Sequence, residues 1–139
     1  MGVGARLVGA GAVLALATTV LTAGQKTTRD GVYTKAQAER AVAQYEKVCA
    51  NCHDPAKVPS DKKPAPPLVG DVFIDNWKDR PLGELLTVIR LTMPSDGSVT
   101  LTTEEAVNLT AFILQMNKFP DGKDELKNDD SGKKVMIVK

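Results

Sequence analysis

The sequence predicts an all-α domain of about three main helices and one short helix. Thr34 and Thr102 are each followed three residues later by an amide or acidic side chain, Gln37 and Glu105, and apolar residues then recur every three or four positions. This pairing is typical of a capping box at the start of a helix. No stretch of any length alternates apolar and polar residues as a half-buried strand would.

The first predicted helix begins at the Thr34 capping box. Ala38, Ala41, Tyr45 and Val48 follow at helical spacing and give it one apolar face. The helix therefore delivers the chain directly to Cys49.

A proline-rich loop is expected next, over residues 54–70. Proline breaks helices and lacks a backbone donor, so a helix is excluded there. The prolines of this loop are Pro55, Pro59, Pro64, Pro66 and Pro67. Residues 71–77 then hold enough apolar side chains for one or two helical turns.

Two longer helices follow. Pro81 suits the first turn of a helix that runs to about Leu91, and Met93–Pro94 breaks it. The last helix starts at the Thr102 capping box and ends before Phe119–Pro120. Its apolar face consists of Leu109, Phe112, Ile113 and Met116.

The N-terminal residues predict export. Arg6 is followed by an apolar run over residues 7–21, shorter than the roughly 20 residues that a membrane-spanning helix needs. Thr22, Ala23 and Gly24 are small residues that suit a signal peptidase, so we expect a signal peptide over residues 1–24 and a periplasmic product. The alternative is an uncleaved anchor that holds the protein at the membrane, facing the periplasm.

Cleavage at that position divides the chain into four parts. These are the signal peptide, a lead-in over residues 25–33, one domain over residues 34–120 and a C-terminal tail over residues 121–139. Loss of residues 1–24 removes one basic residue and leaves 17 basic and 17 acidic residues. With no block of five or more like charges, the chain has no electrostatic support for nucleic-acid binding.

The sequence Cys49-Ala50-Asn51-Cys52-His53 matches the C-x-x-C-H pattern of covalent haem attachment. Two thiols must reach two vinyl groups on one edge of the macrocycle, and the adjacent imidazole must bind the iron from one side. The motif therefore predicts one haem c held by Cys49, Cys52 and His53.

Three other readings of the motif compete. Cys49 and Cys52 could form a disulfide, as exported cysteine pairs often do. A thiol-redox pair needs a preceding strand and a βαβ setting, whereas a helix is expected here. A structural zinc site usually has four Cys or His ligands, and the chain has only three such residues.

The second axial ligand of the iron follows by elimination. His53 is the only histidine, so a methionine is the candidate, and Met1 leaves with the signal peptide. Met116 lies on a helix face and Met136 lies among aliphatic residues, both of which suggest packing. Met93 lies just past a helix in a loop stiffened by the following proline, so we predict that His53 and Met93 bind the iron.

The chain resembles class I c-type cytochromes with one haem over nearly all of residues 25–139. The resemblance rests on the C-x-x-C-H motif, on residues 66–70, on Trp77, on Met93–Pro94 and on the last helix. Residues 30–34, 73–77 and 119–120 are most similar to haem domains associated with quinoprotein (PQQ-dependent) alcohol dehydrogenases.

This resemblance implies a class I cytochrome c-like fold in which the first and last helices cross near Tyr45 and Phe112. The family often has glycine where this chain has Ala41, so the crossing is expected to be slightly wider. It also implies that the Pro66 carbonyl accepts a hydrogen bond from His53, and that Trp77 and Arg90 meet a haem propionate. Otherwise Trp77 is a core aromatic and Arg90 a solvated helix residue.

The expected function is that of a periplasmic single-electron carrier rather than an enzyme, with no catalytic residue. Two neutral axial ligands raise the reduction potential and leave no open position on the iron. The alternative is a haem enzyme or ligand sensor in which Met93 does not bind iron.

The expected partners are redox proteins. The resemblance points to a PQQ-dependent dehydrogenase as the electron donor, and a terminal oxidase or another cytochrome would be the acceptor. Because the charges balance, docking should rely on an apolar rim that includes Val69 or Leu91. A charged patch at Lys62 and Lys63 is the other possibility.

Overall fold

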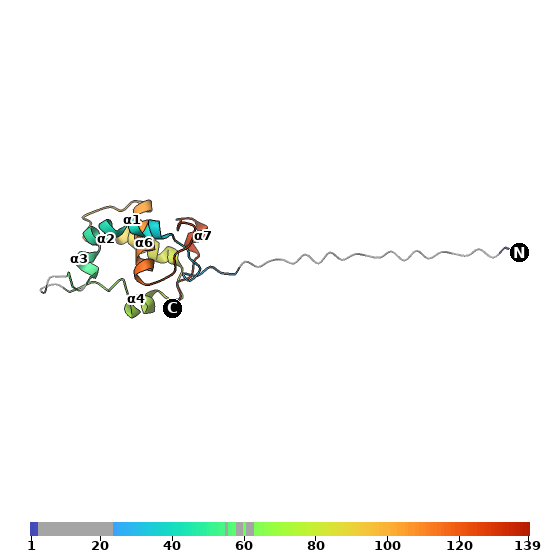
Figure 1. Ribbon diagram of the computed structural model, residues 1–139, viewed down its shortest axis with the longest axis horizontal. Coiled ribbons are helices and arrows are strands. Elements are labelled where there is room, and N and C mark those ends of the chain that lie inside the picture. Colours follow the sequence, from blue (N-terminus) through green and yellow to red (C-terminus); the bar gives the residue numbers. More distant parts are fainter. Residues whose placement is uncertain (3–23, 55, 58–59, 61–62) are drawn as a thin grey trace.

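The computed structural model describes residues 1–2, 24–54, 56–57, 60 and 63–139 (Figure 1). The predicted signal peptide and its cleavage site therefore lie mostly outside the described residues, as do Pro55, Pro59 and Lys62. In the described part the chain is helical, and backbone pairing between extended residues is limited to two isolated bridges. The helices are α1 (Lys35–Arg40), α2 (Val42–Val48), α3 (Ala50–His53), α4 (Asp71–Trp77), α5 (Leu82–Thr92), α6 (Thr103–Met116) and α7 (Asp130–Lys133). The all-α prediction is confirmed.

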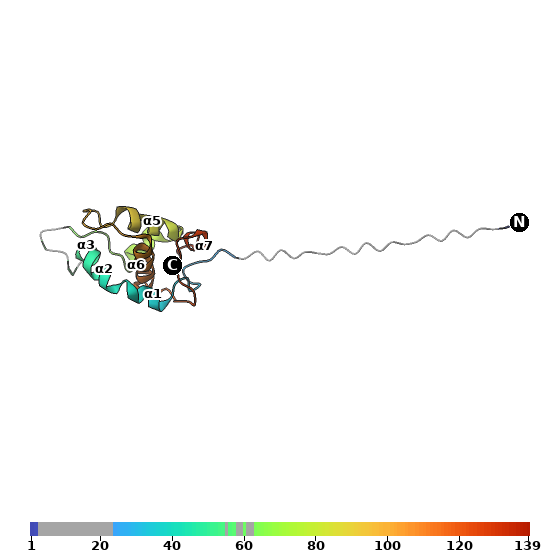
Figure 2. The same ribbon diagram turned by 90° about the horizontal axis from the view of Figure 1, so that it is seen from above.

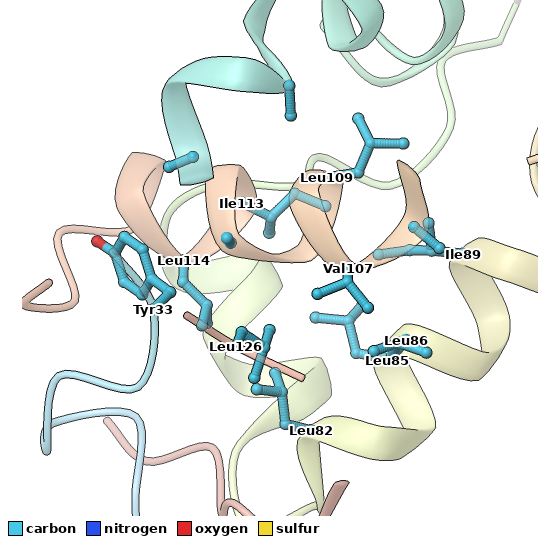
Figure 3. Packing of buried hydrophobic residues seen from close by; sticks show 14 of the residues in the cluster. Tyr33, Leu82, Leu85, Leu86, Ile89, Val107, Leu109, Ile113, Leu114 and Leu126 are labelled. Carbon is cyan, nitrogen blue, oxygen red and sulfur yellow. The ribbon is translucent and has the colours of Figure 1, made fainter. Parts of the chain in front are cut away.

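Helix α6 is the central element. Figure 2 shows it between α1 and α2 on one side and α5 on the other. The capping box predicted at its start is present, because Glu105 N donates to Thr102 Oγ1 and Thr102 N donates to Glu105 Oε2. Leu109, Ile113 and Leu114 are almost fully buried. Figure 3 shows Leu85 and Leu86 of α5 beside Val107 of α6.

The first predicted helix is interrupted. The expectation of one helix from Thr34 to Val48 was wrong, because the chain forms α1 and α2 with a break at Ala41, where the amide bonds to the carbonyl of Ala38. This bond spans three residues, as in a 3₁₀-helix, which is wound more tightly than an α-helix. The two pieces run in nearly the same direction, so the chain is still delivered to Cys49 (Figure 2).

The capping box predicted at Thr34 is only half formed. Thr34 Oγ1 accepts from Gln37 N, but the Gln37 side chain does not return to the cap. Its amide instead bonds to the backbone of Leu126 in both directions, at 2.9 and 2.8 Å. Gln37 is 2% exposed, and its buried side-chain amide bonds to the buried backbone of Leu126 rather than to the backbone of Thr34.

The predicted α5 is present with small shifts at its ends. Pro81 precedes the helix as its N-cap, with extended backbone angles, and does not lie within the first turn. The helix continues to Thr92, one residue past Leu91. Its buried residues are Leu82, Leu85, Leu86 and Ile89.

The lead-in and the tail pack against each other and against the helices. Thr28 N donates to Met136 O, and Met136 N donates to Lys26 O, both at 2.9 Å. Val135 and Ile137 are 2% and 0% exposed. The two chain ends therefore contribute to the same core as the helices between them. In the part of the chain that the structure describes, no helix is long and apolar enough to span a membrane.

Candidate haem-binding site

A cavity of about 410 Å³ lies between α3, the loop that follows it, α4, α5 and α6. This volume is within the range of pockets that hold small molecules, ~300–1,000 Å³. Much of the wall is aliphatic and comes from three helices and the loop. These residues are Val48, Leu68, Leu85, Val88, Ile89, Leu109 and Ile113.

The C-x-x-C-H motif forms one wall of the cavity. Helix α3 is a single turn, closed by hydrogen bonds from Cys52 N and His53 N to Cys49 O. Cys49, Cys52 and His53 all line the cavity, and both cysteines are free thiols. Cys49 is half-buried, and this burial, with a smaller contribution from Cys52, raises the pKa of Cys49 to about 11. The side chain is therefore a neutral thiol at physiological pH.

The His53 ring is oriented by the loop that follows it. Its Nδ1 lies 2.7 Å from the Pro66 carbonyl oxygen. Because a carbonyl oxygen can only accept, Nδ1 carries the proton, and in the neutral ring this leaves the lone pair on Nε2. An imidazole held in this way presents one nitrogen to a metal ion.

Asn117 fixes the loop that carries Pro66, and sequence reasoning did not identify it. Its Nδ2 donates to Leu68 O at 2.9 Å and to Ile113 O at 2.8 Å, and its Oδ1 accepts from Gly70 N at 3.0 Å. These bonds tie the loop to the end of α6. An asparagine after a helix is a known C-terminal signal, but its two loop partners, Leu68 and Gly70, lie far away in the sequence.

Met93 reaches the cavity from the end of α5. The residue is the C-cap of that helix and has extended backbone angles. It is half-buried and lines the cavity together with His53. Met116 packs against the hydrophobic core, Met136 pairs with Thr27 and Pro81, and neither contributes to the described lining.

Trp77 also lines the cavity, together with an arginine other than the one expected. Arg90 is exposed on α5 and is not among the described lining residues. Arg80 takes part in the lining instead, with its Cζ 4.4 Å from the centre of the Trp77 ring and its Nη2 2.6 Å from Glu84 Oε2. Arg80 precedes α5, where the chain turns back from α4, so only the tertiary turn shows that it faces the cavity.

The side chains present suit covalently attached haem. The aliphatic wall matches the apolar macrocycle, two free thiols share the cavity with an oriented imidazole, and a thioether reaches the same space. A nitrogen and a sulfur ligand are both neutral and form a recognised axial pair for haem iron. The cavity therefore has the donor set that the sequence motif requires.

Comparison with protein families gives a match that covers the centre of the chain. Residues 36–113, more than half of the chain, match the family described as cytochrome C oxidase, cbb3-type, subunit III. The matched range includes the C-x-x-C-H motif, Pro66, Trp77 and Met93. Neither the curated proteins nor the solved structures gave a match.

Proposed function

Because the chain belongs to the family described as cytochrome C oxidase, cbb3-type, subunit III, we propose that it is an exported one-electron carrier with a single His/Met-ligated haem. Membership of this cytochrome c family implies covalently attached haem c, a class I cytochrome c-like fold and redox proteins as partners. Such domains are in general electron carriers and not enzymes. The observation that carries the proposal is that His53 and Met93 line the same cavity as Cys49 and Cys52.

When bound, the haem supplies a one-electron couple, and the protein side chains set its properties. His53 and Met93 would bind the iron, and the Pro66 carbonyl would keep the imidazole in its binding tautomer. Neutral ligands favour the reduced iron, and a thioether ligand raises the potential. The aliphatic wall limits the access of water to the site.

Covalent attachment is the first test. Protein produced in a host with haem-attachment machinery should gain the mass of one haem. Cys52→Ala should lose stable covalent haem and most of the folded protein, because the core is built around the cofactor. Haem that extracts freely from the wild-type protein into acidified organic solvent would falsify the proposal.

The second candidate function is a haem enzyme or ligand sensor with an open sixth position. Met93 at the cavity favours the electron carrier, because a bound thioether leaves no site for oxygen or peroxide. The oxidised protein should show the weak long-wavelength absorption band of a sulfur–iron bond. Absence of this band, together with rapid binding of an added ligand, would favour the second function.

The proposed location is the periplasm, after removal of residues 1–24. The apolar run over residues 7–21 and the small residues before Gln25 support this. N-terminal sequencing of the purified protein should begin at Gln25. Residues 1–24 found intact on protein purified from membranes would support the anchored form instead.

The proposed electron donor is a PQQ-dependent dehydrogenase, and the acceptor a terminal oxidase or another cytochrome. Similarity to the haem domains of quinoprotein alcohol dehydrogenases supports the donor. Val69 and Leu91 are 47% and 65% exposed, which suits an apolar docking rim. With balanced charges, the rate of reduction by such a dehydrogenase should change little between low and moderate salt. A steep fall with salt would point to charged docking through Lys63 and its neighbours.

A further inference from the structure

The end of the chain runs along the turn between α4 and α5. Three backbone hydrogen bonds join the two segments: Asp79 N donates to Ile137 O at 2.8 Å, Ile137 N to Arg80 O at 3.0 Å, and Leu82 N to Val135 O at 2.7 Å. Val135 and Ile137 are buried, so solvent does not compete for these bonds. We call residues 135–137 the C-terminal strap.

The turn that the strap holds is strained. Asp79 has a φ of 63°, in the left-handed region that residues other than glycine rarely adopt. Such a conformation persists only when surrounding contacts impose it. Here the two bonds to Ile137 involve Asp79 N and Arg80 O, so they hold the backbone on both sides of the peptide that joins Asp79 to Arg80. The strap therefore fixes the backbone from which the Arg80 side chain starts.

Arg80 brings a guanidinium to the cavity wall, and its ion pair with Glu84 offsets part of the positive charge. Among the described lining residues it is the one with a permanent charge, in a wall that is otherwise largely apolar. Its guanidinium lies over the Trp77 ring and bonds to Glu84 on the next turn, so the side chain has a defined orientation as well as a fixed start. A cation in this position suits the carboxylates of haem.

We infer that the C-terminal strap is a positioning element that holds Arg80 against the haem pocket, where its charge pairs with a haem carboxylate and raises the reduction potential. This inference rests on the proposed function. A cation beside the haem opposes the additional positive charge of the oxidised iron, so it favours the reduced form. The family match ends at residue 113, and the strap therefore lies outside the matched range.

The experiment measures the midpoint potential of the full-length haem protein by spectroelectrochemistry. Arg80→Gln should lower the potential. Ile137→Pro removes the N–H that bonds to Arg80 O and should also lower the potential. The milder Ile137→Ala should lower the potential by less. Val138→Pro is the matched control, because the Val138 amide bonds to Thr28 Oγ1 and not to the turn, so its potential should equal that of the wild type.

A variant that carries both substitutions shows whether the strap changes the potential through Arg80. If the strap acts through Arg80, adding Ile137→Ala to Arg80→Gln should cause no further fall. The inference is overturned if Arg80→Gln leaves the potential unchanged, if Ile137→Ala leaves it unchanged in a folded protein, or if the two falls simply add. Wild-type protein without covalent haem would overturn the proposed function as well, and its mass shows this before any potential is measured.

Discussion

The contact between Gln37 and Leu126 gives the most direct test of whether the C-terminal region belongs to the folded unit. The Gln37 amide satisfies both the N–H and the C=O of Leu126, at 2.8 and 2.9 Å, and the two residues are 2% and 5% exposed. Gln37→Ala removes both bonds and leaves two buried backbone groups without partners. A buried group without a partner costs about 1–3 kcal/mol. With two such groups, we expect a loss of about 2–6 kcal/mol in the free energy of unfolding.

The assay is thermal and denaturant unfolding of the haem-loaded protein. For a domain of this size each kcal/mol corresponds to a shift of about 4 °C, so the midpoint of thermal unfolding should fall by about 8–24 °C. The Leu126 amide should also exchange its hydrogen faster. Glu39→Ala is the control, because Glu39 lies on α1 but is exposed, and its effect should stay within about 0.5 kcal/mol.

The reasoning fails if Gln37→Ala is no more destabilising than Glu39→Ala. Such a result would mean that the region around Leu126 is not held to α1 in solution. Gln37→Glu gives a second check, since one carboxylate oxygen can still accept from Leu126 N while the other faces Leu126 O. This variant should be destabilised at neutral pH and should regain stability when the carboxyl is protonated.

Three further predictions concern ligation, pH and packing. Met93→Ala should give a high-spin or water-ligated haem with a lower potential. Met116→Ala should keep the sulfur–iron absorption band and lose about 2–5 kcal/mol of stability. The opposite pattern of spectra would mean that Met116, not Met93, binds the iron. Hydrogen bonds from the backbone and then the side chain of Thr102 lower the pKa of Glu105, so its contribution to stability is present above the unfolded pKa and is lost as the pH falls through the folded pKa. Glu105→Gln should flatten that acid-side loss in a plot of unfolding free energy against pH, and an unchanged slope would contradict the capping role. Gly122→Ala would bring a Cβ to 1.9 Å from the Gly31 carbonyl oxygen, so it should lower the free energy of unfolding in denaturant by about 1–3 kcal/mol or more. A variant as stable as the wild type would show that the segments around Gly31 and Gly122 separate easily.

The sequence by itself determined the features that depend on neighbouring residues. The helical periods, the Thr102 capping box and the break at Met93–Pro94 arise from interactions within a few positions, and a local pattern is enough to predict them. The haem motif belongs to the same class, because the spacing of its two thiols and imidazole is set within five residues. The all-α fold class followed from these patterns.

Only the tertiary structure decided which distant groups meet. Gln37 was expected to complete a local cap, yet it bonds to a residue 89 positions away, because a buried amide must find partners wherever the fold supplies them. Asn117 holds a loop 49 residues away, and this contact has no local pattern. Arg80 rather than Arg90 lines the cavity because the turn before α5 directs it there, and the pairing of that turn with the last residues of the chain is a long-range contact that no spacing in the sequence records.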